Sequence, residues 1–188
     1  MVCRFNVKPL CYDGISLNDL HICGDGSGRA LIAGGIPIQN VSIINVWIEY
    51  VEDGLHLIGE SLSNPLKNFT MSDVLISEVS GTPVTLWYTD GVNINLSSFS
   101  GYPGQALISE DALIPVDAKH NWWGGMCPGN VISGNVEFSP WAVDASFSGF
   151  ISEQPACLPT ETGDNVTVGF NLIDYPIDTL AYTISLLS

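Results

Sequence analysis

Asn40-Val-Ser-Ile-Ile-Asn-Val-Trp-Ile-Glu-Tyr-Val-Glu-Asp-Gly-Leu-His-Leu-Ile-Gly59 is the stretch that decides the fold. Its apolar residues alternate in three pairs, which are Val41 with Ile43, Val46 with Ile48, and Leu55 with Leu57. A period of two predicts short strands that each bury one face. Asn45 and the sequence Glu52-Asp53-Gly54 separate the pairs and allow the chain to turn.

This unit is repeated along the chain. Its first two pairs align with segments that start at Ile15, Phe69 and, more weakly, Val92, so the repeat begins at 15, 41, 69 and 92. The third pair follows an independent frame, whose expected inward residues are Ala30, Leu55, Val84, Ala106 and Val131. Two frames with a similar period predict the coils of a parallel β-solenoid, with three short strands in each coil. An antiparallel β-sandwich also has short strands and turns, but the aligned repeat disfavours it.

Stacked coils place equivalent residues above one another, about 4.8 Å apart. The alignment therefore predicts a corner at which Asp19, Asn45 and Asp73 stack, since Asn and Asp tolerate unusual backbone angles. It also predicts three outward rows. These are Ser16, Ser42, Thr70 and Asn93 on the first strand, His21, Trp47 and Leu75 on the second, and Leu31, His56, Thr85 and Leu107 on the third.

The segment Asn121-Trp-Trp-Gly124, followed by Gly129 and by Ile132-Ser-Gly-Asn-Val-Glu-Phe-Ser-Pro-Trp141, resembles a known architecture. It is similar to the last coil of right-handed parallel β-helix repeat proteins of the pectin-lyase-like superfamily. The resemblance covers roughly residues 14–145. It implies an all-β, right-handed parallel β-helix of about five coils, and it implies no particular activity, because the family includes lyases, hydrolases, adhesins and scaffold proteins. We expect Trp122, Trp123 and Trp141 to close the end of the core.

Four regions are predicted along the chain. They are an N-terminal cap over residues 1–13, the β-helix over 14–148, a linker over 149–163, and a pair of alternating strands over 164–188. The strand pair resembles the opening strands of a cohesin-like β-sandwich. Because two strands are marginal alone, we expect them to pack on the helix end or to pair with another chain. The sequence contains neither a stretch of transmembrane length nor the apolar run of a signal peptide.

The chain is strongly acidic, with 5 Lys and Arg against 20 Asp and Glu among 188 residues and a formal charge of −15. Such a surface repels phosphate groups, so we expect neither nucleic-acid binding nor membrane insertion. It also disfavours a polyuronate lyase, which needs cations to bind the carboxylates of its substrate. The composition suits an extracellular or cell-surface location in a saline or Ca²⁺-containing medium. It predicts no cofactor, and a role for Ca²⁺ has no support in the sequence.

The five cysteines are an odd number, so at least one is unpaired or pairs with another chain. Two disulfides are candidates, one between Cys3 and Cys23 and one between Cys127 and Cys157. The alternative is that these thiols pack as small apolar residues, and their spacing predicts no metal site.

Four sequons for N-glycosylation are present, at Asn40, Asn68, Asn95 and Asn165. They matter only if the source is eukaryotic. Asn40 and Asn68 occupy equivalent places in successive coils, so glycans on both would crowd each other.

Two candidate sites follow from the rows. Glu52, Asp53 and His56, with Glu49 one strand earlier, are the best candidates for catalysis, since two carboxylates can cleave a glycosidic bond. Glu-Asp before a glycine is also an ordinary turn. The row of His21, Trp47 and Leu75 is a candidate ligand surface, because sugar rings stack on aromatic side chains. The alternative is that a loop or a partner chain covers this row.

The sequence therefore predicts an extracellular, non-catalytic structural or adhesive module that binds through its lateral face or assembles with itself through exposed strands. The alternatives are a carbohydrate-active enzyme, either a polysaccharide hydrolase or a lyase, and a glycan-binding module. The expected partners are copies of the same chain or a polysaccharide.

Overall fold

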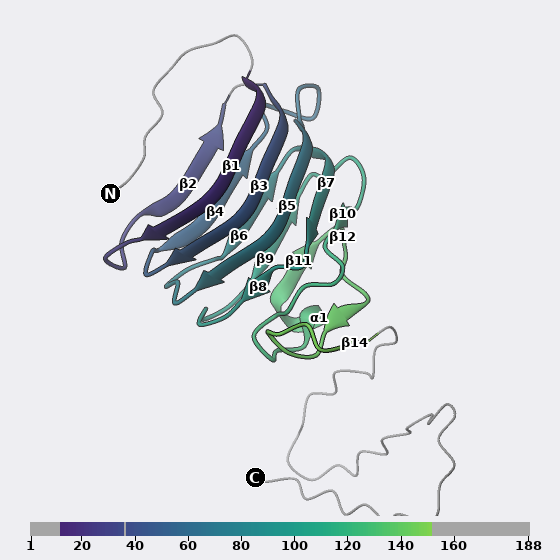
Figure 1. Ribbon diagram of the computed structural model, residues 1–188. Coiled ribbons are helices and arrows are strands. Elements are labelled where there is room, and N and C mark those ends of the chain that lie inside the picture. The colour runs from purple at the N-terminus through teal and green to yellow at the C-terminus, as the bar shows by residue number, and fades with distance from the viewer. Residues whose placement is uncertain (1–11, 36, 152–188) are drawn as a thin grey trace, which may run out of the picture. The chain divides into compact units, whose positions relative to one another are not determined.

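The computed structural model describes residues 12–35 and 37–151. Two parallel sheets run side by side through them (Figure 1). Sheet A contains seven strands, which are β1 (Tyr12–Cys23), β3 (Ile38–Glu49), β5 (Leu66–Ser77), β7 (Thr89–Asn95), β8 (Ser98–Phe99), β10 (Val116–Asp117) and β12 (Val136–Glu137). Sheet B contains five strands, which are β2 (Arg29–Gly34), β4 (Asp53–Ile58), β6 (Val84–Trp87), β9 (Leu107–Glu110) and β11 (Ile132–Gly134).

From β1 to β12 the chain alternates between the two sheets, except that β7 and β8 follow each other within sheet A. Every pairing within sheets A and B is parallel. This arrangement is a parallel β-solenoid, and the five strands of sheet B correspond to about five coils. The predicted all-β solenoid is confirmed.

The last coil is followed by short elements of other kinds. Helix α1 (Pro128–Val131) begins at a proline and leads directly into β11, and β13 (Trp141–Ala142) pairs antiparallel with β14 (Phe150–Ile151). None of the helices in the described part of the chain has the length and apolar character needed to cross a membrane. The chain divides into two compact units, Met1–Cys157 and Leu158–Ser188. The predicted strand pair at 164–188, most of the linker and most of the N-terminal cap lie outside the described residues.

The corner inside the long strands of sheet A is the one that the sequence predicts. Asp19, Asn45 and Asp73 adopt left-handed backbone angles, with φ values of 54°, 52° and 55°. The Nδ2 atom of Asn45 donates a hydrogen bond of 2.6 Å to the Oδ1 atom of Asp19. The register of the next two coils places Leu96 and His120 at the same corner, also with positive φ. Leucine disfavours this conformation and histidine tolerates it, but neither continues the Asn and Asp pattern from which the sequence predicted the corner.

The inward residues of sheet A form continuous columns. Ile43, Met71 and Ile94 are neighbours in register and are all fully buried. The same holds for Ile48, Ile76 and Phe99. Stacking of large apolar side chains along the axis gives the solenoid one core, which no single coil could form alone.

The predicted register of sheet B is partly wrong. Leu55 does lie beside Val84, but Leu31 and Leu107 share their inward column, whereas Ala30, Ala106 and Val131 each lie one residue earlier. The outward column is therefore Ile32, His56, Thr85 and Ile108, with Ile32 and Ile108 in place of the predicted Leu31 and Leu107. The cause is Gly54, which belongs to the strand and stands opposite Ala30, whereas Gly28 lies in the preceding turn. Alignment on these glycines therefore shifts the register by one.

Aromatic residues close the C-terminal end of the core, as the sequence predicts, but only two of the three tryptophans take part. Trp123 is buried and stacks on Phe99, with ring centroids 4.8 Å apart and planes at 13°. Trp141 is also buried. Trp122 is half-buried and pairs with Ser98 on the outward side, because adjacent residues of a strand point to opposite faces.

Candidate functional site

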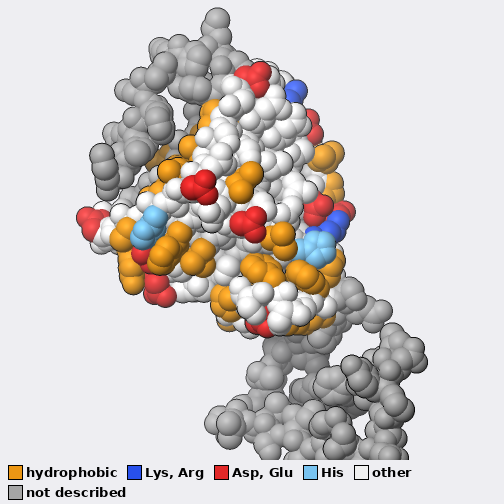
Figure 2. Space-filling model, viewed as in Figure 1, with side chains coloured by type: hydrophobic (Ala, Val, Ile, Leu, Met, Phe, Trp, Pro, Cys, Tyr) orange, Lys and Arg blue, Asp and Glu red, His pale blue; other side chains and the backbone are white. Residues whose placement is uncertain are grey.

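The candidate ligand surface is an outward row on sheet A, which we call the aromatic row. The register places its residues on successive coils in the order His21, Trp47, Leu75, Ser98 and Trp122. This confirms the predicted positions of the first three. Val46 and Ile48, the neighbours of Trp47 along β3, are buried in the core. The side chain of Trp47 therefore projects outward, and the residue is 42% exposed. Figure 2 shows one face of the molecule, on which hydrophobic side chains lie in patches between isolated acidic groups.

The first two rings of the aromatic row are stacked. The imidazole of His21 and the indole of Trp47 have centroids 4.3 Å apart and planes at 14°. This geometry follows from the fold, since parallel strands in register bring equivalent side chains to about the strand spacing. The Nε2 atom of His21 is also 2.9 Å from the Oε1 atom of Glu49. That contact crosses from β1 to β3, so His21 is held by both a ring and a carboxylate.

The stack limits what the aromatic row can bind. His21 covers one face of the Trp47 indole, and the register places Leu75 on the next coil, on the other side. A sugar that stacks on an aromatic residue needs an open ring face. The exposed part of Trp47 is therefore mainly a ring edge, which suits an apolar contact with a flat partner better than it suits ring stacking.

The candidate catalytic cluster begins at Asp53, the first residue of β4. Its Oδ2 atom is 2.9 Å from the Nε atom of Arg29, and its Oδ1 atom accepts a hydrogen bond of 3.0 Å from the backbone N–H of Thr82. The side chain thus joins three successive coils. Both of its oxygens are engaged in holding the solenoid together.

The other two members of the cluster differ in their surroundings. Glu52 is exposed and belongs to the turn before β4. His56 lies in the outward column of sheet B, with its ring tilted against Trp87 at a centroid distance of 6.3 Å. Burial lowers the pKa of His56, and the charge of Arg29 lowers it further. Its Nδ1 atom is buried and has no hydrogen-bond partner among the described residues.

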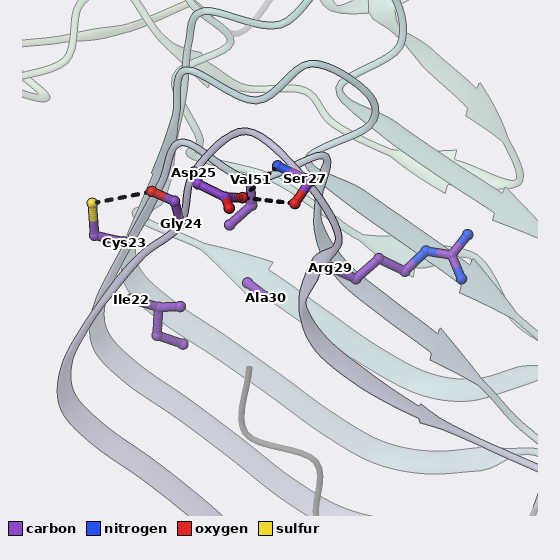
Figure 3. A pocket seen from close by; sticks show the side chains of 8 residues that line it. All are labelled: Ile22, Cys23, Gly24, Asp25, Ser27, Arg29, Ala30 and Val51. Carbon is purple, nitrogen blue, oxygen red and sulfur yellow. Dashed lines mark hydrogen bonds between the residues drawn. The ribbon is translucent and has the colours of Figure 1, made fainter. Parts of the chain in front are cut away.

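A cavity of about 310 Å³ lies at the N-terminal end of the solenoid, in the loop between β1 and β2 (Figure 3). Ile22, Ala30 and Val51 line it with apolar groups. Its polar groups satisfy one another, since the Oδ1 atom of Asp25 accepts hydrogen bonds from both the backbone N–H and the hydroxyl of Ser27. These bonds lower the pKa of Asp25. The cavity is therefore lined by both apolar and polar groups, and the carboxylate of Asp25 is already bonded to Ser27.

The cysteine predictions have different outcomes. Cys23 carries a free, exposed thiol that points to the carbonyl oxygen of Gly24, so the candidate bond between Cys3 and Cys23 is absent. A spacing of 20 residues, close to one coil, does not by itself bring two sulfurs within bonding distance. Cys127 is disulfide-bonded, and its partner is not among the described residues. Its predicted partner Cys157, like Cys3, lies outside them, so that pairing stays a prediction.

The sequon asparagines form part of the scaffold. Asn40 and Asn68 stack with left-handed backbone angles, and the Nδ2 atom of Asn68 donates a hydrogen bond of 2.9 Å to the Oδ1 atom of Asn40. The Nδ2 atom of Asn40 donates in turn to Asp13, and that of Asn95 to Asn93. Each amide nitrogen that a glycan would modify already serves as a donor. Asn165 lies outside the described residues.

Sequence reasoning missed several residues that matter here. Ser98 and Trp122 extend the aromatic row, and their spacing from Leu75 continues the repeat, so a longer alignment could have found them. Nothing in the sequence indicated that Glu49 would bind His21. Among the described residues, no group of three His, Cys, Asp or Glu side chains is placed to hold a metal ion.

Comparison with known proteins found no matching family model, no matching curated protein and no matching solved structure.

Proposed function

We propose that the chain is a non-catalytic structural or adhesive module of the extracellular space or of a cell surface, built as a right-handed β-helix of the pectin-lyase-like type. One observation carries the proposal. Two of the three acidic candidates are already bound to neighbouring coils, Asp53 to Arg29 and Thr82, and Glu49 to His21, so exposed Glu52 has no second free carboxylate beside it in the cluster. A catalytic acid or base must instead be free to exchange a proton with the substrate.

The exposed side chains support a role in surface contact. Ile44 and Trp47 are large exposed apolar groups that project from the same strand, β3, of a rigid scaffold. Exposed apolar groups gathered on one face indicate a contact with another molecule. The charge of −15 favours a neutral or cationic partner over a polyanion.

Polysaccharide and further copies of the chain are the proposed partners. The edge of β1 supports self-assembly, because this strand of 12 residues has β3 as its one neighbour in the described part of sheet A. A free strand edge offers a row of backbone donors and acceptors to another chain. The predicted strand pair at 164–188, with its cohesin-like character, is a second proposed route to assembly.

The two alternative functions have less support from the arrangement of the side chains. A glycan-binding module would use the aromatic row, but the stack of His21 on Trp47 leaves little open ring face. A polysaccharide hydrolase or lyase would use Glu52, Asp53 and His56, but Asp53 is held by its two partners in the scaffold.

The test measures association and chemistry on the full chain. Sedimentation velocity over a concentration series and retention on insoluble polysaccharides would be compared for the wild type, Trp47→Ser, and Trp87→Ser as a matched control on sheet B. We expect self-association or retention in the wild type, a clear loss in Trp47→Ser and no change in Trp87→Ser. We also expect no release of reducing ends from neutral or acidic polysaccharides.

Two results would contradict the proposal. One is a wild type that stays monomeric and unretained at every concentration. The other is release of sugar that Glu52→Gln abolishes, which would establish an enzyme instead.

A further inference from the structure

Two outward columns lie side by side on the part of sheet A that follows the corner. The first is the aromatic row. The second contains, from the first coil to the fifth, Cys23, Glu49, Ser77, Ser100 and Gly124. The last two residues continue the register, since the backbone N–H of Ser100 donates to the carbonyl oxygen of Ile76 and a Cβ atom on Gly124 would lie 3.4 Å from the Cα atom of Ser100. The two columns, about 7 Å apart along the strands, form the surface that a flat partner would meet.

This surface is not level, because bulky side chains stand in its second coil and small ones in its fourth. In the aromatic row Trp47 is 42% exposed, whereas Ser98, two coils later, is 8% exposed. In the second column the long side chain of Glu49 is likewise followed, two coils later, by Ser100. The partner that fits best therefore has the opposite relief, with small groups facing the second coil and bulky groups facing the fourth.

A second copy of the chain has this opposite relief when its coils run the other way. A two-fold axis that lies parallel to the strands at the level of Leu75 reverses the order of the coils and leaves each column facing itself. It places Trp47 of each copy over Ser98 of the other. Glu49 faces Ser100 in the same way. A two-fold axis along the solenoid would instead set Trp47 against Trp47, one bulky group against another.

The charged groups at the rim of this surface agree with the reversed orientation. The corner column runs from Asp19 in the first coil through Asp73 in the third to His120 in the fifth. The rotation brings Asp19 of each copy level with His120 of the other, so that a carboxylate faces an imidazole, which can carry a proton. Asp73 lies level with the axis, so its two copies face each other. The rim is therefore complementary at both ends and repulsive at its centre.

We propose that the aromatic row binds a second copy of the chain face to face, with the coils of the two copies in opposite order and the contact centred on Leu75. The inference rests on the proposed function, which makes this row the contact surface, and it adds the partner and its orientation. Four steps of about 4.8 Å along the axis, two columns wide, cover about 300 Å², well below the roughly 800 Å² per partner of a standard interface. The dimer is therefore weak and forms at high protein concentration.

Chemical cross-linking tests the orientation. In a full chain that carries Cys23→Ser, a cysteine would be introduced by Ser77→Cys, level with the axis, or by Ser100→Cys, the matched control one coil away. Both serines are half-buried in the second column. Packed sheets lie about 10 Å apart, so the two copies of position 77 are separated by about 10 Å and those of position 100 by about 14 Å. A short bismaleimide would be added at high protein concentration, and linked peptides would be identified by mass spectrometry, with Cys23→Ser alone as the background.

We expect Ser77→Cys to give at least about fivefold more cross-linked dimer than Ser100→Cys. Equal or reversed yields would overturn the proposal, because no two-fold axis would then lie at the third coil. Absence of links from both variants would overturn it as well. The proposed function survives that last result if the wild type still associates or is retained on a polysaccharide, and it falls if the wild type does neither.

A second measurement uses the charges of the corner column. Asp73→Asn and Asp19→Asn remove the same charge from two places, and Asn45 shows that the corner accepts asparagine. Removing the repulsion at the axis should lower the dissociation constant of the dimer about threefold in Asp73→Asn, as measured by sedimentation. Asp19→Asn should leave the constant unchanged or raise it. Equal tightening in both variants would show that net charge alone matters and would contradict the reversed orientation.

Discussion

Asn121 is a buried amide that holds two successive coils together, and its removal is the sharpest test of the packing described above. Its Nδ2 atom donates hydrogen bonds of 2.7 Å to the carbonyl oxygens of Ile94 and Ala118. Its Oδ1 atom accepts a bond of 2.9 Å from the backbone N–H of Ser97. All three contacts are buried, so Asn121→Ala would leave three backbone groups without a partner and without water.

The size of the effect follows from these three groups. A buried polar group left without its partner costs about 1–3 kcal/mol. Three such groups, at the lower part of that range and with some relaxation, give a loss of about 4 kcal/mol in the free energy of unfolding. For a chain of this length, a change of 1 kcal/mol shifts the unfolding midpoint by about 2–4 °C, so we expect Asn121→Ala to unfold about 8–16 °C below the wild type.

Asn95→Ala is the matched control, because its amide donates to one half-buried side-chain partner, Asn93. We expect a loss of about 1 kcal/mol or less there. The assay is thermal and urea unfolding followed by tryptophan fluorescence and by circular dichroism, with hydrogen exchange at the Ser97 amide as a local readout. A loss in Asn121→Ala no larger than in Asn95→Ala, or an unchanged Ser97 amide, would refute the reasoning that this side chain bridges the coils.

Three further predictions concern other parts of the solenoid. Gly134→Ala should destabilise the fold strongly, because a Cβ atom there would lie 1.7 Å from the carbonyl oxygen of Ser109 and the backbone has φ of +98°. Gly104→Ala is the control, and it should change the unfolding midpoint little because no atom lies within 4 Å of its Cβ position. Burial holds the pKa of His56 in the folded protein below its unfolded value of about 6.5. The contribution of the neutral ring to stability is therefore fully present above pH 6.5 and is lost as the pH falls toward the lower pKa of the folded state. The drop in unfolding midpoint between pH 7.5 and 5.5 should therefore be smaller in His56→Gln than in the wild type, and an equal drop would contradict this. Because His21 covers a face of Trp47, His21→Ser should change the fluorescence of Trp47 and its access to iodide, and unchanged quenching would count against the stack.

The fold was largely predictable because the solenoid repeats one pattern with one spacing. Two columns that the sequence predicted, Asp19–Asn45–Asp73 and His21–Trp47–Leu75, are present in register. Both rest on side chains whose chemistry identifies their place, a left-handed corner in one case and an outward ring in the other. Local chemistry and long-range register agree there, so each supports the other.

The errors lie where local chemistry is ambiguous or where neighbours override it. Gly54 belongs to a strand whereas Gly28 lies in the turn before one, so their alignment placed Ala30 beside Leu55, where the structure has Leu31. Leu96 adopts a left-handed backbone because the coils on both sides fix the corner, although leucine itself disfavours it. The bond between Glu49 and His21 depends on two side chains 28 residues apart, and no repeat signal encodes it.

The same stacking that makes this chain predictable also determines where it can act. Side chains in register satisfy one another along the axis, as Asn68 does with Asn40 and His21 with Trp47. Groups engaged in this way are poor candidates for binding a small ligand or for moving a proton. Unsatisfied groups are expected where the stacking stops, which is at the edge strands of the first coil, and on outward side chains too large for their neighbours to cover. The search for a partner of this chain should therefore begin at the edge of β1 that none of the described strands covers and at the exposed part of Trp47.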